Sequence, residues 1–207
     1  ACKDAGADAV CVIVGYKGGE VKNAIYDVVD YVEQKEQLGT GHAVKCAKEF
    51  IGTDGDTLVL CGDTPLITGK TLTGLVEKHR KEANGVTVLS AILDDAAGYG
   101  RIIRDAAGNF EKIVEHKDAT EEERACKEVN SGMYIFNSEA LSASLELLSN
   151  DNAAGEYYLT DTIALIKKIG LKVSALPLTG AACDEIRGVN TIDQLEEAEQ
   201  IMCHRED

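Results

Sequence analysis

Short apolar runs rich in β-branched residues recur along the chain and predict strands. They occupy residues 9–14, 57–61, 86–92, 112–114, 129–136 and 171–176. The first two runs are continuous rather than alternating, a pattern typical of strands that are covered on both faces, as in parallel sheets. The pattern therefore predicts a mostly parallel sheet.

Amphipathic stretches lie between and after these runs and predict helices that flank the sheet. They occupy residues 41–51, 72–83, 139–148, 161–169 and 192–202. Thr191 with Gln194, and Thr120 with Glu123, have the spacing of a capping box, which predicts a helix start at both places. This alternation indicates an α/β fold, and because we find no linker or internal repeat, we expect a single domain over residues 1–207.

Two regions depart from the alternation. Between Arg101 and Phe136 the helical pattern stops. Turns such as the one from Asp105 to Gly108 join strand-like segments there, which predicts a small antiparallel substrate flap. At the start of the chain, residues 1–6 resemble the tail of a helix. We therefore expect residues 9–14 to be the second strand of a doubly wound sheet whose first strand is missing, which leaves strand edges exposed.

The chain is strongly acidic, with 21 Lys and Arg against 36 Asp and Glu and a net charge of -15. Such a surface repels nucleic acid and anionic membranes, so neither is expected as a partner. It repels phosphates as well. An anionic ligand therefore needs local compensation from backbone N–H groups, a helix N-terminus or a divalent cation.

The cysteines number seven, are scattered and include no C-x-x-C pair: Cys2, Cys11, Cys46, Cys61, Cys126, Cys183 and Cys203. This usage is typical of reduced thiols and predicts neither disulfides nor a structural zinc site. The sequence opens on no signal peptide and has no apolar stretch near the ~20 residues that span a bilayer. We expect a cytoplasmic protein.

The apolar run at 57–61 leads directly into Gly62 and Asp63. In open α/β sheets ligands bind beyond the carboxyl ends of the strands, so Asp63 is a candidate ligand for Mg²⁺, and the cation would supply the compensating charge. A turn that begins at Asp63 and continues into Pro65 explains the same residues equally well.

Residues 34–43 form a Gly-rich loop that runs into a helical pattern. Backbone N–H groups in such a loop can hold a uracil or phosphate oxygen. An ordinary helix entry is the commoner explanation of such a loop, and no Gly-Lys-Ser/Thr follows that would make it a Walker loop. We interpret His42 as a capping or packing residue rather than a base.

Further polar clusters have ordinary structural explanations when they are taken singly. Gly100 suits a tight turn, and Asn130 and Asn190 lie beside glycines where caps and turns are common. Glu115 lies in a charged strand end, which suits a solvated edge and also suits hydrogen bonds to sugar hydroxyls. Tyr158 precedes a helix and suits packing in the core.

Read in order, however, these segments resemble the uridylyltransferase domain of the bacterial bifunctional N-acetylglucosamine-1-phosphate uridylyltransferase/glucosamine-1-phosphate acetyltransferase family. The resemblance covers nearly the whole chain and implies a Rossmann-like nucleotide-diphospho-sugar transferase fold. Its markers are Glu36-Gln-Leu-Gly-Thr-Gly-His-Ala43, Gly62-Asp-Thr-Pro-Leu66, Gly98-Tyr-Gly-Arg101, Ile113-Val-Glu-His-Lys-Asp-Ala119, Asn130-Ser-Gly132, Gly155-Glu-Tyr-Tyr-Leu-Thr-Asp161 and Gly188-Val-Asn190.

The resemblance implies a role for each matching residue. Asp63 and Asn190 match the positions that bind Mg²⁺ and serve catalysis. The positions that match uracil recognition are Gln34, Gly39 and Thr40, with Gln37, Cys61 and Gly62 as further substrate-binding residues. Contacts to the N-acetylglucosamine moiety match Gly100, Glu115 and Asn130, and Tyr158 lies in the segment that lines the sugar pocket.

The implied reaction joins UTP and N-acetylglucosamine 1-phosphate into UDP-N-acetylglucosamine and pyrophosphate, a step in cell-wall biogenesis. The sugar phosphate is already a competent nucleophile, so positioning and charge neutralisation carry catalysis and no general base is needed. A homo-oligomer is a further candidate assembly.

The chain also departs from the family pattern. It lacks the opening Gly-rich loop, with its Arg and Lys, that holds the triphosphate, so we expect weak nucleotide binding and little turnover from these 207 residues. It also ends before the β-helix that carries acetyl transfer. Alternatives are a related nucleotidyltransferase of other specificity, or a sugar-nucleotide-binding remnant without catalysis. Cys61 stands where the family often has an aromatic residue.

Overall fold

The computed structural model describes residues 1–25, 28–152 and 154–205. The strands in this part of the chain are β1 (Cys11–Val14), β2 (Asp30–Glu33), β3 (Asp56–Val59), β4 (Val86–Ile92), β5 (Arg101–Arg104), β6 (Phe110–Val114), β7 (Glu128–Asn137) and β8 (Val173–Leu178). The helices are α1 (Gly18–Ala24), α2 (Thr40–Cys46), α3 (Lys48–Ile51), α4 (Gly69–Glu82), α5 (Glu121–Arg124), α6 (Ser138–Leu145), α7 (Thr160–Lys168), the 3-10 helix η1 (Gly180–Ile186) and α8 (Ile192–Arg205).

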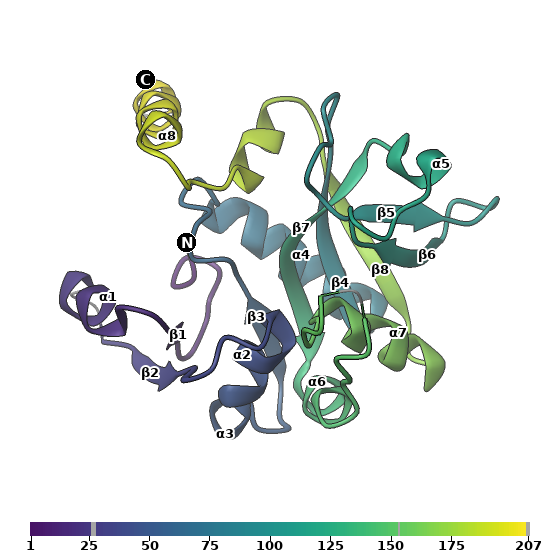
Figure 1. Ribbon diagram of the computed structural model, residues 1–207, viewed down its shortest axis with the longest axis horizontal. Helices are drawn as coiled ribbons and strands as arrows, with labels where there is room; N and C mark the ends of the chain where they lie inside the picture. Colours follow the sequence, from purple (N-terminus) through teal and green to yellow (C-terminus); the bar gives the residue numbers. More distant parts are fainter. Residues whose placement is uncertain (26–27, 153, 206–207) are drawn as a thin grey trace.

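The strands form two sheets (Figure 1). β1 and β2 make a small parallel sheet that lies with α1 on one side of the molecule. The larger sheet has the order β6-β5-β7-β4-β8, and β3 pairs with β7 outside this path. β5 and β6 form an antiparallel hairpin at its far end, opposite β1 and β2.

The larger sheet is covered on both faces. Tyr134 and Phe136 of β7 belong to one buried cluster, whereas Met133 and Ile135 belong to another. Because successive side chains of a strand point to opposite faces, the two clusters lie on opposite sides of the sheet. Val44 of α2 joins the first cluster and α4 packs into the second, so the two helices cover different faces.

The predicted α/β fold with a helix-flanked sheet is confirmed, and each predicted strand and helix has a counterpart. The pairing is more mixed than predicted. β3 and β4 both run antiparallel to β7, which lies between them, and within the described ranges only β4–β8 and β1–β2 are parallel pairs. The reason is that the chain enters β7 from the β5–β6 hairpin. A return through a hairpin produces an antiparallel neighbour, whereas a parallel one needs a long crossover.

Several local features also differ from the sequence prediction. The pattern missed α1 and β2, which are short and little buried. The helix predicted over 41–51 breaks at Ala47 into α2 and α3. Residues 2–6 form turns rather than the end of a helix.

Three predicted local motifs are confirmed. The turn that ends at Gly108 closes with a Gly108 N to Asp105 O hydrogen bond of 2.9 Å and joins β5 to β6. Thr120 and Glu123 form the predicted capping box. Thr191 and Gln194 do the same at the start of α8. No helix among the described residues combines the length and apolar character of a membrane span.

Candidate functional site

Asp63 lies in the loop that follows β3, where its carboxylate is exposed. Its carbonyl accepts a hydrogen bond of 2.7 Å from the Val189 amide, which fixes the Gly188–Asn190 turn against this loop. A Cβ atom on Gly188 would lie 3.5 Å from Asp63 Oδ2 and also 3.5 Å from Asn190 Nδ2. The structure therefore brings the Asp63 and Asn190 side chains close to the same glycine.

Asn190 is held by the cap of α8. Its backbone amide donates to Gln194 Oε1 at 2.7 Å, and the Gln194 amide donates to Thr191 Oγ1 at 3.2 Å. Its exposed side chain can turn its amide oxygen toward Asp63. A carboxylate and an amide oxygen suit Mg²⁺, which usually keeps several waters and takes few protein ligands. The described part of the chain contains no cluster of three His, Cys, Asp or Glu side chains that could hold a metal ion.

Cys61 links this loop to β7. Its thiol approaches Gly132 O at 3.4 Å, and a Cβ on Gly132 would lie only 2.9 Å from the sulfur. Burial, together with the nearby Asp63 carboxylate, raises the pKa of Cys61 to about 11. The thiol is therefore neutral at pH 7 and acts as a packing group beside the site.

Gly100, Glu115 and Asn130 lie close together. The Asn130 amide donates to Gly100 O at 2.9 Å. A Cβ on Gly100 would lie 3.3 Å from Glu115 Oε2, so a side chain there would crowd the carboxylate. Glu115 Oε1 accepts a hydrogen bond of 3.1 Å from Thr160 Oγ1. Burial raises the pKa of Glu115. The Thr160 hydrogen bond lowers it in part, and the Asp118 and Asp161 carboxylates add to the rise.

The Asn130 side chain is buried and engaged within the protein. Its Nδ2 donates to the Tyr134 hydroxyl at 2.8 Å, and its Oδ1 accepts from the Gly132 amide at 3.2 Å. Tyr158 lies nearby and is half-buried. Burial and the Asp118 carboxylate raise its pKa, as do other carboxylates that include Glu115. The predicted sugar-side residues therefore form one cluster around Glu115.

The predicted base-side residues form a second group. Gln34 Nε2 donates to Gly39 O at 3.1 Å and lies 3.1 Å from His42 Nδ1, while Gln37 Nε2 donates to Gln34 O at 3.3 Å. The Thr40 hydroxyl accepts a hydrogen bond of 3.1 Å from the Leu159 amide. The loop is thus tied to the segment that carries Tyr158, which brings the two groups next to each other.

Gly39 is required by this docking. Its φ of 109° favours glycine, and a Cβ there would lie 2.6 Å from Tyr157 O. The Gly41 amide donates to the same carbonyl at 2.7 Å. Close backbone packing therefore accounts for Gly39 and Gly41 in this loop. His42 contacts Gln34 and lies near the Tyr157 ring.

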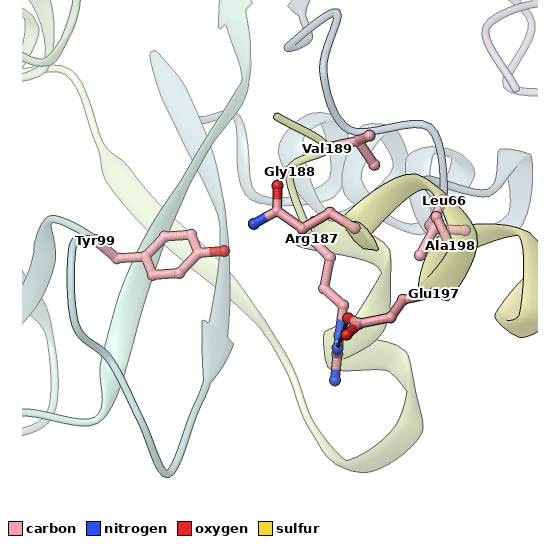
Figure 2. Close-up of a pocket in the computed structure, with 8 residues that line it drawn as sticks. Leu66, Tyr99, Arg187, Gly188, Val189, Glu197 and Ala198 are labelled. Atoms are coloured by element: carbon pink, nitrogen blue, oxygen red, sulfur yellow. Dashed lines mark ion pairs between the residues drawn. The ribbon is translucent and has the colours of Figure 1, made fainter. Parts of the chain in front are cut away.

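A cavity of about 150 Å³ lies beside Gly188. Figure 2 shows the Tyr99 ring directed toward Arg187 and Gly188 from the opposite wall, and Arg187 extending to Glu197. Burial raises the pKa of Tyr99; the Arg187 guanidinium opposes this shift and the Asp63 carboxylate adds to it.

Tyr99, Arg187 and Thr160 were missed as site residues by the sequence analysis. Each lies directly beside a predicted residue: Tyr99 precedes Gly100, Arg187 is three residues before Asn190, and Thr160 is two residues after Tyr158. The available signal was that Tyr99 and Thr160 lie within quoted motifs and that Arg187 directly precedes one. Nothing in the residue types alone distinguished them from turn, surface or helix-start residues.

Comparisons with known proteins identify the family of this chain. The family model described as "Nucleotidyl transferase" matches residues 1–182. "Bifunctional protein GlmU" of Caldanaerobacter subterraneus subsp. tengcongensis is 51% identical over 205 residues, which is 99% of this chain and 44% of the relative. The protein of the same name from Acetivibrio thermocellus is 48% identical over 204 residues. These residues are 98% of this chain and 44% of the relative's length. The chain thus spans less than half the length of these curated relatives.

Two solved structures share the fold. A UDP-glucose pyrophosphorylase complexed with UDP-glucose has a TM-score of 0.75 at 17% identity and covers 99% of this chain and 84% of its own. A putative glucose-1-phosphate thymidylyltransferase from Bacillus anthracis has a TM-score of 0.71 at 21% identity. The match covers 97% of this chain and 78% of the thymidylyltransferase chain. Proteins of this kind generally use a divalent metal ion. The chain belongs to the nucleotidyl transferase family.

Proposed function

We propose that this domain transfers UMP from UTP to N-acetylglucosamine 1-phosphate, producing UDP-N-acetylglucosamine and pyrophosphate with Mg²⁺ as cofactor. An oxygen of the sugar phosphate forms a bond to the α-phosphorus of UTP, while the bond from that phosphorus to the pyrophosphate oxygen breaks. The relatives of about 50% identity support this assignment, as does the clustering of the predicted sugar-side residues. Seven free cysteines suit a reducing compartment, and we propose a cytoplasmic location.

Asp63 and Asn190 are the residues proposed to hold the metal. Mg²⁺ bound there would neutralise charge on the phosphate oxygens as the α-phosphorus is attacked. The exposed Asp63 carboxylate and the Asn190 side-chain amide both lie close to Gly188. On a chain of net charge -15, this compensation is needed for a triphosphate to bind.

The observation that carries the sugar assignment is the position of Glu115. Its carboxylate is partly buried, faces Gly100 and is oriented by Thr160. A carboxylate in such a place accepts hydrogen bonds from sugar hydroxyls and amides, and a buried acceptor left without a donor is costly. Gln34, Gln37, Gly39 and Thr40 are proposed to face the uracil, with Cys61 and Gly62 at the uridine side.

Calorimetry with Mg²⁺ tests the sugar assignment. We expect UDP-N-acetylglucosamine to bind about tenfold more tightly than UDP-glucose, because one buried hydrogen bond contributes on the order of 1 kcal/mol. The readout needs no turnover. Equal affinity for both sugar nucleotides would contradict the proposed specificity and favour a related nucleotidyltransferase.

The metal assignment is tested by Asp63→Ala. We expect Mg²⁺ to tighten UTP binding to the wild-type chain and to have no effect on the variant. Any Mg²⁺-dependent pyrophosphate release should fall at least about 100-fold in the variant, by analogy with the loss of one preorganised electrostatic group. Glu77→Ala is the control, since it removes an exposed carboxylate of α4. An Asp63→Ala chain that keeps its Mg²⁺ response would remove Asp63 from the metal site.

A further inference from the structure

Glu185 is a buried carboxylate at the end of η1 that joins two distant segments of the chain. It is 7% exposed, and its Oε2 atom accepts hydrogen bonds of 3.0 Å from both the backbone amide and the hydroxyl of Thr68. Both of these partners are neutral donors rather than cations. Burying a carboxylate with such partners is costly, because little of its lost hydration is replaced. What this carboxylate holds in place indicates why the fold keeps it.

Glu185 and Thr68 lie at the far ends of the two segments that carry the proposed metal ligands. Asp63 lies five positions before Thr68, and Asn190 lies five positions after Glu185. At the near ends of the same segments, the Val189 amide donates to Asp63 O at 2.7 Å. The two segments therefore run past each other in opposite directions and are joined at both ends.

The two segments lie outside the sheets. Residues 63–68 belong to the loop between β3 and α4, and residues 185–190 lead from the end of η1 to the start of α8. Leu66 of the first segment and Val189 of the second line the same cavity (Figure 2). Since no strand ladder fixes these segments, the relative positions of Asp63 and Asn190 depend on packing and on hydrogen bonds such as those of Glu185.

The link from Glu185 continues into α4. The Thr68 hydroxyl has one proton, which it donates to Glu185, so its lone pairs remain free to accept a hydrogen bond of 3.2 Å from the Thr71 amide. Thr68 is the N-cap of α4, a position where negative charge is favourable. Ile186, the next residue along the chain, belongs to the same buried cluster as Leu75 of α4. The contact is therefore both directional and packed.

We propose that Glu185 is a positioning residue, which sets the separation of Asp63 and Asn190 by holding the far ends of their segments together. This inference rests on the proposed function, because it concerns the two proposed metal ligands. Glu185 acts through Thr68 rather than on a substrate or the metal. Loss of its acceptor oxygen should loosen the contact between Val189 and Asp63, whereas a neutral amide oxygen in the same place should preserve it.

Glu185→Leu and Glu185→Gln form the matched pair. Both keep a side chain of similar size, but only glutamine retains an oxygen that accepts the two Thr68 bonds. Hydrogen exchange of the Val189 amide, measured by NMR on the 207-residue chain without metal or nucleotide, reports its bond to Asp63. We expect Glu185→Leu to accelerate this exchange at least about tenfold, since two buried hydrogen bonds are lost. Glu185→Gln should change it by less than about threefold, since only the charge is lost.

Mg²⁺ titrations of UTP binding supply the functional readout. Glu185→Leu should raise the Mg²⁺ concentration for half-maximal tightening of UTP binding at least about tenfold, and Glu185→Gln should leave it within about threefold of the wild type. Phe136→Leu is the control for stability alone, because Phe136 and Ile186 belong to the clusters on opposite faces of the larger sheet. It should lower the midpoint of urea denaturation and leave both readouts near the wild type.

Thr68→Val tests the link from its other end, because it removes the hydroxyl bond and leaves the backbone amide. It should accelerate Val189 exchange less than Glu185→Leu and add little in the double variant, since both changes break one link. Unchanged exchange in Glu185→Leu would overturn the proposal. So would faster exchange with an unchanged Mg²⁺ response, or equal effects from Phe136→Leu. A wild-type chain whose UTP binding ignores Mg²⁺ would instead overturn the proposed metal site, and faster exchange in Glu185→Leu would then mean that the link serves the fold alone.

Discussion

The two sheets of this protein differ sharply in how they are held. In β4 and β7 nearly every residue is buried, and side chains from both faces join large apolar clusters. In the smaller sheet only Val14 of β1 is buried, and α1 buries no residue. The sugar-side residues thus rest on a packed sheet, whereas the base-side loop follows β2 and depends on its contacts with residues 157–159.

The two halves of the candidate site are therefore positioned by different kinds of interaction. Asn130 is fixed by burial and by hydrogen bonds to Tyr134 and Gly132. Gly39 and Thr40 are fixed by close backbone approach and a few hydrogen bonds. We therefore expect mutations on the two sides to act differently, on global stability in the first case and on local order in the second.

The largest expected effect comes from truncating the packed sheet. Phe136 is fully buried, and the centroid of its ring lies 5.6 Å from the centroid of the Tyr134 ring. Phe136→Ala should lower the free energy of unfolding by about 3–5 kcal/mol. Val12→Ala on half-buried β1 should lower it by about 1 kcal/mol or less. Urea denaturation measures both, and equal losses would show that the smaller sheet is as tightly packed as the larger one.

An intermediate effect is expected at the base-side loop. Gly39→Ala combines an unfavourable φ with a clash against Tyr157 and should destabilise the docked loop by about 1–3 kcal/mol. Hydrogen exchange of the Gly41 and Tyr157 amides should then accelerate, because both amides bond across this contact.

Gly19→Ala is the matched control for this change. Its added Cβ meets no atom within 4 Å, and α1 is a helix, in which alanine is favoured by up to about 1 kcal/mol. Unchanged exchange at Gly41 in Gly39→Ala would mean that the loop does not depend on this close approach.

The smallest expected effect concerns pH. Burial raises the pKa of Glu115 above its ordinary value of 4.5, so the folded protein holds this proton more strongly than the unfolded chain. Stability from this group is then present below pH 4.5 and is lost as pH rises through the raised pKa. Glu115→Gln should therefore melt higher than the wild type at pH 7, with the difference vanishing at low pH.

The same variant should bind UDP-N-acetylglucosamine more weakly, because a neutral acceptor replaces a charged one. Glu77→Gln provides the exposed control and should shift neither melting nor binding. A Glu115→Gln protein that melts lower than the wild type at pH 7 would show that its carboxylate is stabilising, against the direction argued here.

Much of the fold could be predicted from local pattern. The apolar runs at β3, β4 and β7, and the capping boxes at Thr120 and Thr191, are local signals that the structure confirms. The position of β7 between β3 and β4 could not be predicted, because strand order depends on contacts between distant residues. α1 and β2 were missed because little of either is buried, which leaves a weak periodic signal.

For the site, the sequence by itself determined the candidate residues and, through the order of their motifs, the family. Only the tertiary structure decided which of them meet. Asp63 and Asn190 are 127 positions apart in the chain, and both lie close to Gly188 because a backbone hydrogen bond joins Val189 to Asp63. The structure likewise decided that Glu115 lies beside Gly100 and Thr160. Such proximity arises from packing between distant segments, which no local pattern encodes.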